Sequence, residues 1–136
     1  MGSLDAKTRY ALLAALDLAE HSAEGSPTKV REIAARTSTP EKYLVHILLR
    51  LKRRALVNSS RGVHGGYWLV RPPEYISAAD VIAAVEGDAG ESGERAEATP
   101  YDWVIGRLEK EAEDQKRHFL ARVTLAEMLK HKKTSG

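Results

Sequence analysis

Apolar residues recur with helical spacing through the first half of the chain, and this periodicity predicts three helices. Residues 5–21 are apolar almost all round, so we expect this helix to lie in the core. A shorter helix is expected at about residues 29–36, with Thr28 as its cap and an apolar inner side. A tight turn then leads into a third helix. Two short helices joined in this way are typical of a helix-turn-helix unit.

The third helix has the most regular pattern. Thr39 is placed to cap it, and Pro40 suits its first turn, where a missing N–H costs no hydrogen bond. Apolar positions spaced at i, i+3, i+4, i+7 and i+11 predict one buried stripe, formed by Leu44, Ile47, Leu48, Leu51 and Ala55. At ~100° per residue, the opposite side carries Lys42, His46, Leu49 and Arg53, with Arg50 on its shoulder. A helix with a basic outer face is what a winged helix-turn-helix presents to a DNA groove.

Two short strands with a glycine-bearing tip are expected after the third helix. Residues 56–60 and 67–70 form the strands, and the tip Arg61–Gly66 lies between them. Glycines at 62, 65 and 66 allow positive φ and a close approach of the backbone to phosphate. Arg61 and His64 would then reach a flanking groove of a duplex. An ordinary exposed hairpin is the alternative, and the adjacent basic helix favours a DNA-binding wing.

The second half of the chain is expected to contain two short helices, a linker and one long helix. Ser77 and Asp80 form a box-like cap for a helix at residues 78–86. Residues 87–100 are rich in Gly, Ala and Glu with no apolar period, which predicts a flexible linker. A last short helix follows Thr124, which forms a capping box with Glu127.

The long helix, expected at residues 101–122, would extend ~33 Å at 1.5 Å per residue. It carries a heptad seam with 4-3-4-3-4 spacing, formed by Tyr101, Ile105, Leu108, Ala112, Gln115 and Phe119. So narrow a seam needs a partner, so the helix either folds back on its own domain or pairs with a second chain. The length of the seam and the small size of the N-terminal domain favour a homodimer.

Together these patterns predict a mainly α fold with a small β-hairpin wing. Residues 1–86 form a winged helix-turn-helix DNA-binding domain, residues 87–100 a flexible loop, and residues 101–136 a dimerisation helix with a short C-terminal helix. In the 136 residues no run approaches the ~20 apolar residues of a membrane span, and no signal peptide precedes the first helix. We therefore expect a soluble, cytoplasmic protein.

The charge is distributed unevenly, although the net charge is only +2. Residues 1–72 hold 12 Lys and Arg against 6 Asp and Glu, a balance of +6, whereas residues 73–136 hold 9 against 13, a balance of −4. Scattered surface charge is one explanation. The positive excess coincides with the expected recognition helix and wing, which favours a nucleic-acid partner for the first half.

Several segments of the sequence match a known family. The run Tyr43-Leu44, Leu51 and Ala55-Leu56-Val57 leads into the wing sequence SRGVHGGY, residues 60–67. The opening KTRYAL (residues 7–12) and the segment LVRPP (residues 69–73) with Ile76 fit the same pattern. These residues resemble the signature of the Rrf2 family of bacterial winged helix-turn-helix transcription regulators. The resemblance covers nearly the whole chain, and the RGxxGGY wing is its most specific part.

The resemblance implies that the protein binds a palindromic DNA operator as a homodimer. The expected DNA-binding residues are Lys7, Tyr10, Thr39, Glu41, Lys42, Tyr43, His46, Arg50, Arg53, Arg61, His64, Gly65 and Gly66. Lys7 and Tyr10 either meet a phosphate near the positive end of the helix dipole or are solvated first-turn residues. Arg53 either contacts a phosphate or complements the helix dipole. Many family members carry Glu-Gln where this chain has Val45-His46, which argues for a different operator.

The chain has no cysteine. Many relatives in the family sense iron–sulfur clusters or nitric oxide through three cysteines in the loop that corresponds to residues 87–100. Clusters are held by thiolates, so we expect no cluster, no cofactor and no metal. The resemblance then implies a small molecule or a protein as effector. Trp103 and Tyr101 could line its pocket, although interface core is the better interpretation of Trp103, which we place at the dimer interface with the seam.

Catalytic motifs are missing from the sequence. No two of the five histidines are spaced i, i+3 or i, i+4, and GxSxG, Walker A and GxGxxG motifs are absent. We therefore expect no enzyme. A winged-helix module that docks protein and a nonspecific DNA-binding protein remain as alternatives. Salt dependence of binding and competition with random duplex would distinguish them from a sequence-specific regulator.

Overall fold

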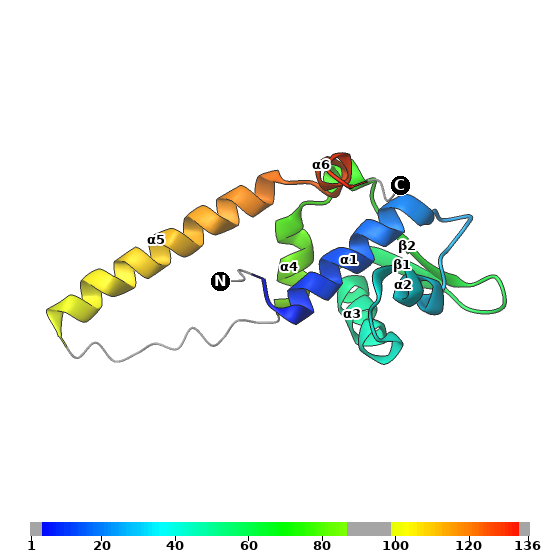
Figure 1. Cartoon of the computed structure of the whole chain (residues 1–136), viewed down its shortest axis with the longest axis horizontal. Helices are drawn as coiled ribbons and strands as arrows, with labels where there is room; N and C mark the ends of the chain where they lie inside the picture. The colour runs from blue at the N-terminus through cyan, green and yellow to red at the C-terminus, as the bar shows by residue number, and fades with distance from the viewer. Residues whose placement is uncertain (1–3, 87–98, 134–136) are drawn as a thin grey trace.

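The computed structural model describes residues 4–86 and 99–133 (Figure 1). Its elements, in chain order, are α1 (Ala6–His21), α2 (Val30–Thr37), α3 (Glu41–Arg53), β1 (Val57–Ser60), β2 (Gly66–Leu69), η1 (Pro73–Tyr75), α4 (Ala78–Glu86), α5 (Pro100–Arg122) and α6 (Leu125–Lys130). The mainly helical fold with a two-stranded wing is confirmed. The linker expected at residues 87–100 lies outside the described residues, except for Thr99 and Pro100, which begin α5.

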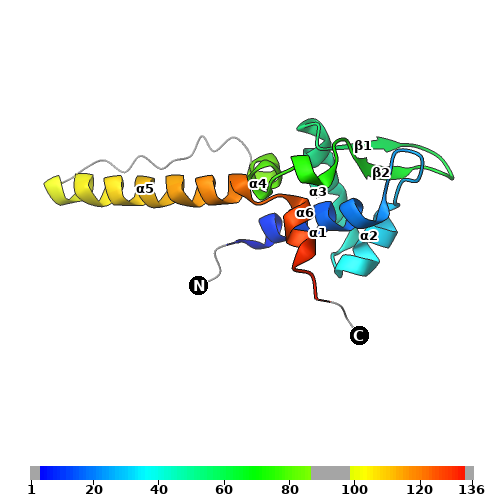
Figure 2. The ribbon, with the colours of Figure 1, turned by 90° about the horizontal axis from the view of Figure 1, so that it is seen from above.

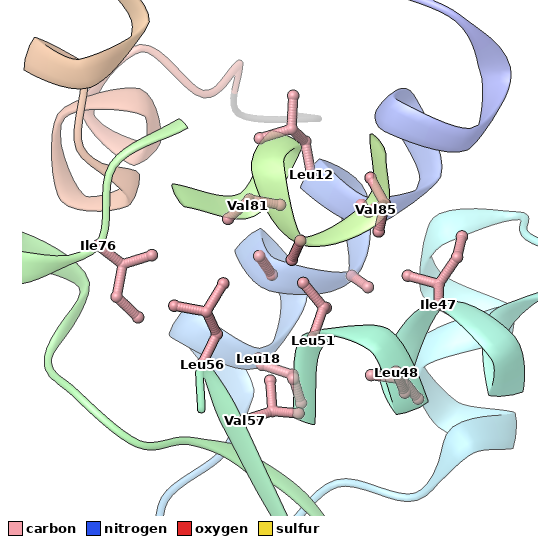
Figure 3. Close-up of a cluster of buried hydrophobic side chains, with 14 of the residues drawn as sticks. Leu12, Leu18, Ile47, Leu48, Leu51, Leu56, Val57, Ile76, Val81 and Val85 are labelled. Carbon is pink, nitrogen blue, oxygen red and sulfur yellow. The ribbon is translucent and has the colours of Figure 1, made fainter. Parts of the chain in front are cut away.

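The core is formed where α1, α3 and α4 meet. Helix α1 begins at Asp5, whose carboxylate accepts a hydrogen bond from the Thr8 N–H at 2.8 Å. Side chains from these three helices and from β1 point into one space, as Figure 3 shows for Leu18, Leu51 and Val85. The expectation that α1 lies in the core is therefore confirmed.

The caps expected for α2 and α3 are wrong. The Thr28 hydroxyl donates to the His21 carbonyl, and α2 instead begins at Lys29, whose N–H donates to the Glu32 carboxylate at 3.0 Å. Thr39 is buried and its hydroxyl is hydrogen-bonded to that of Thr37 at 2.8 Å, so Pro40 takes the cap position of α3. Both threonine side chains are buried and bond to other groups rather than to the first turn of the following helix.

An ion pair between a buried carboxylate and an exposed guanidinium connects α1 to α2. The Asp17 carboxylate, only 5% exposed, accepts two hydrogen bonds from the Arg36 guanidinium, at 2.7 and 3.0 Å. The hydrogen bond to Asp17 raises the pKa of Arg36 above its usual value. Because both carboxylate oxygens are engaged, the pair sets how α2 lies against α1.

Helix α3 buries one side against the core and ends earlier than its apolar pattern suggests. Leu44, Ile47, Leu48 and Leu51 are buried as predicted. The prediction that Ala55 continues the stripe is wrong: the helix ends at Arg53, and Ala55 is exposed with φ 59°. This left-handed residue turns the chain so that Leu56 and Val57 enter the core instead.

The wing is an antiparallel hairpin whose second strand is attached to the helix-turn-helix unit. Strand β1 pairs with β2, with Val57 opposite Leu69 and Ser60 opposite Gly66. Thr28 and Tyr67 exchange two backbone hydrogen bonds, at 2.8 and 2.9 Å, across an isolated bridge. The hairpin is therefore connected to the loop before α2 one residue pair from its tip, and the tip projects beyond this connection (Figures 1 and 2).

Helix α4 begins with the predicted capping arrangement. The Asp80 N–H donates to the Ser77 hydroxyl and the Ser77 N–H donates to the Asp80 carboxylate, each at 3.0 Å. Downstream, the Ala78 N–H donates to the Val123 carbonyl and the Leu125 N–H donates to the Ile76 carbonyl. These bonds fix the start of α4 to the α5–α6 junction.

Helix α5 extends away from the rest of the molecule in both views (Figures 1 and 2). No residue of α5 is buried, and only its last turns reach the core, through Leu120. The last helix, α6, begins after Thr124, whose hydroxyl accepts from the Glu127 N–H at 3.0 Å as predicted. Among the described residues, no helix is both long and apolar enough to cross a membrane.

Candidate nucleic-acid interface

The outer face of α3 is basic and exposed, as its pattern predicted. Lys42, His46, Leu49 and Arg53 all lie on the side opposite the buried stripe. Helix α3 carries four Lys and Arg residues and one acidic residue, Glu41. The helix therefore offers a row of cations to a polyanion.

A groove between the start of α1 and this face joins two segments that are distant in the sequence. Its volume is about 380 Å³, and its lining is formed by Lys7, Tyr43, His46, Ile47, Leu49, Arg50 and Arg53. Tyr10 of α1 packs edge-on against Tyr43, with ring centroids 5.1 Å apart and planes at 65°. The aromatic pair holds the first turns of α1 beside α3. Lys7 and Arg53 are therefore placed to contact the same stretch of a phosphate backbone.

Arg50 has a structural contact that the sequence did not reveal. Its Nη1 donates to the Val85 carbonyl at 2.7 Å, so α3 contributes a donor to the last turn of α4. This contact complements the negative end of the α4 dipole. Arg50 remains in the groove, but part of its guanidinium is already occupied.

Thr39 and Glu41, at the start of α3, differ in their exposure to solvent. Thr39 is 4% exposed, so its side chain does not belong to the outer face. Glu41 is exposed and lies in a shallow hollow with Lys29, Arg31 and the wing residue Val63. Its carboxylate is therefore set among cations contributed by α2, which the sequence pattern did not identify.

The wing tip exposes Arg61, Val63 and His64, while two of its glycines are needed for packing. A side chain at Gly65 would meet the Ser60 carbonyl oxygen at 2.3 Å, and one at Gly66 would meet the Thr28 carbonyl oxygen at 2.6 Å. Gly62 and Gly66 use the positive φ that glycine allows, at 100° and 153°, whereas Gly65 does not. Lys29 Nζ donates to the Gly65 carbonyl at 3.2 Å, which ties the tip to α2.

The seam of α5 lies along one exposed side of the helix. Tyr101, Ile105, Leu108 and Phe119 each leave more than half of their surface exposed. Trp103 lies two positions after Tyr101, about 200° around the helix, and therefore does not share this side. Its ring instead packs under the Arg107 guanidinium, 5.5 Å from the ring centroid.

Binding of iron by a protein depends on the side chains that can act as its ligands. The chain has no cysteine, and within residues 4–86 and 99–133 no three His, Asp or Glu side chains lie close enough together to hold a metal ion. An iron–sulfur cluster needs thiolate ligands, which this chain cannot supply.

The sequence matches one family over nearly its whole length. The family described as "Rrf2: Iron-dependent Transcriptional regulator" matches residues 4–131. An "HTH-type transcriptional regulator rrf2-like" of Rhodobacter capsulatus is 40% identical over 83 residues, which are 60% of this chain and 55% of that protein. The chain spans about half the length of the first curated relatives that it matches.

Solved structures of two regulators superpose on the whole chain. IscR of T. potens has a TM-score of 0.78 and 30% identity, covering 99% of this chain and 94% of that one. CymR, described as the global cysteine regulator of B. subtilis, has a TM-score of 0.79 and 29% identity, covering 98% of this chain and 100% of that one. These similarities extend through α5 and α6 as well as the winged-helix part.

Proposed function

Because the chain belongs to the Rrf2 family of transcriptional regulators, we propose that it binds a palindromic DNA operator as a homodimer, without an iron–sulfur cluster. Its named relatives are transcriptional regulators and not enzymes. The observation that carries the proposal is the exposed basic face of α3, with Lys7 of α1 beside it. In this arrangement α3 enters a major groove, while Lys7 and Arg53 contact phosphates along its edge.

The wing supports a second contact on the same duplex. Arg61 and His64 are exposed at the tip, and Tyr67, which lies just after the tip, is bonded to Thr28 in the loop before α2. This connection allows the tip to hold a fixed position relative to α3. Arg61 then reaches an adjacent groove, where positive side chains are attracted by the dense phosphate charge.

The proposed dimer is supported by the exposed seam of α5. A 23-residue helix with no buried residue, and with large apolar side chains at heptad spacing, would be left with its apolar side in water. Pairing with the same seam of a second copy removes this surface from water and gives a two-fold arrangement. Two α3 helices related by a two-fold axis match an operator with palindromic half-sites.

The absence of a cluster rests on ligand chemistry. With no thiolate available, the iron dependence in the family description does not transfer to this chain. The purified protein should contain no stoichiometric iron and show no cluster absorbance, even after expression in iron-rich medium. One or more bound iron atoms per chain would contradict this part of the proposal.

The DNA-binding proposal is tested with the full chain and a random pool of duplexes. We expect repeated selection to enrich a two-fold symmetric sequence, which the protein then binds with a log–log salt slope near −7 if ~8 phosphates are neutralised. The Arg53→Ala variant should weaken binding and reduce the slope by about one. Lys130→Ala, on α6 and paired with Glu127, is the matched control and should bind like wild type. A folded protein that enriches no sequence would refute the proposal.

A further inference from the structure

Two apolar side chains project from the exposed surface of α3. Val45 is 44% exposed and Leu49 is 45% exposed, and they lie one helical turn apart. The core contacts of α3 are already made by Leu44, Ile47, Leu48 and Leu51. Val45 and Leu49 therefore do not complete the core.

The surroundings of this pair are cationic. Lys42 precedes it, Arg53 follows it on the same face, and Lys52 lies toward the wing, where its Nζ donates to the Ser59 hydroxyl at 2.7 Å. Leu49 also lines the groove that contains Lys7. The charge of this surface suits a duplex, so the occupant of the apolar pair should be an apolar part of DNA.

Base edges in the major groove offer one apolar group, the C5-methyl group of thymine. Val45 and Leu49 cannot donate or accept a hydrogen bond, so they cannot read guanine, cytosine or adenine edges. Four residues of helix rise by about 6 Å, close to two base-pair steps of roughly 3.4 Å each. Both side chains can therefore meet methyl groups within one short run of base pairs.

We propose that Val45 and Leu49 read thymine methyl groups in each half-site of the operator. The inference rests on the proposed DNA-binding function and adds the base type that this recognition helix selects. His46, which follows Val45 in the sequence and is also exposed, supplies a polar contact to a neighbouring base edge.

The test removes the methyl group and nothing else. Once selection from random duplexes has provided an operator, each thymine is replaced in turn by deoxyuridine, which keeps every hydrogen-bonding group of the base. We expect one or two positions per half-site at which the loss of one methyl weakens binding of the full wild-type chain about four-fold. The same replacement in both half-sites should weaken binding about fifteen-fold.

Variants then assign the effect to the two side chains. Val45→Ala and Leu49→Ala should each bind the thymine operator less tightly and lose the difference between thymine and deoxyuridine at one position. Val45→Thr keeps the side-chain volume and should reduce the difference without changing helix content, as measured by circular dichroism. Tyr75→Ala removes an exposed apolar side chain elsewhere and should keep the full difference.

The outcomes separate this inference from the proposed function. An enriched operator whose half-sites lack thymine, or whose thymines all tolerate deoxyuridine, overturns the inference and leaves DNA binding intact. Variants that weaken both duplexes equally also overturn it, because the side chains would then act through packing or through a protein partner. A pool that yields no enriched sequence overturns both.

Discussion

Helices α3 and α5 are both amphipathic, yet their apolar sides end up in opposite environments. The stripe of α3 is buried by α1 and α4 of the same chain, and the exposed side is basic. The seam of α5 stays exposed along the helix, and only the last turns reach the core. Helix α3 therefore buries its apolar side within one chain, whereas α5 would bury its seam only in the proposed dimer.

The largest expected effect comes from the buried side of α3. Leu48→Ala should lower the free energy of unfolding by about 3 kcal/mol, because it leaves a cavity in the core. For a chain of this size the melting temperature should fall roughly 10 °C. Leu49→Ala, one position further along the same helix and exposed, is the control and should cost under about 0.5 kcal/mol in thermal unfolding. Equal losses would show that the two sides of α3 do not differ as described.

The second prediction concerns the seam of α5. Leu108→Asp places a charge in the proposed interface, so light scattering should show half the mass of wild type. Operator affinity should fall about a hundred-fold, because each monomer then binds its half-site alone, without the avidity of two subunits joined in one dimer. Lys110→Asp also adds negative charge but lies about 180° from Tyr101 on the helix, and it should remain dimeric. An unchanged mass for Leu108→Asp would argue that α5 pairs elsewhere.

A smaller effect is expected at the wing tip. Arg61→Ala should weaken operator binding about five-fold and reduce the salt slope by about one, because one phosphate or groove contact is lost. The melting temperature should stay within about 1 °C of wild type, since Arg61 is exposed. Binding measured by fluorescence anisotropy at several salt concentrations checks both numbers. A wild-type affinity and slope would remove the wing from the interface.

The smallest effect is expected at the start of α1, which positions Lys7 beside α3. The hydrogen bonds from Thr8 to the Asp5 carboxylate lower its pKa below 3.8. A lowered pKa in the folded state means that this stabilisation is complete above pH 3.8 and is lost as the pH falls through the lowered value. Asp5→Ala should therefore cost about 0.5–1 kcal/mol at neutral pH. Its unfolding free energy should converge with that of wild type below pH 3.8, and a constant difference down to pH 2 would contradict this role.

The fold could be predicted from the sequence because most of its signals are local. The four leucine and isoleucine positions of α3 and the Ser77–Asp80 box depend on neighbours within one or two turns. The candidate site was harder to predict. The groove between α1 and α3 depends on the packing of Tyr10 against Tyr43, and Glu41 shares a hollow with Lys29 and Arg31, which lie about ten residues before it in the sequence.

By itself, the sequence determined where the helices lie, which side of α3 is apolar and which side is basic, and that α5 carries a seam. These features depend on the 3.6-residue period and on caps, which act over a few residues. Tertiary structure alone decided that Thr28 and Thr39 bond away from the helix starts, and that Arg50 reaches the Val85 carbonyl. It also decided that Gly65 and Gly66 serve packing. The physical reason is that a buried polar group takes whichever partner the packed chain brings within reach, and that partner can be distant in sequence.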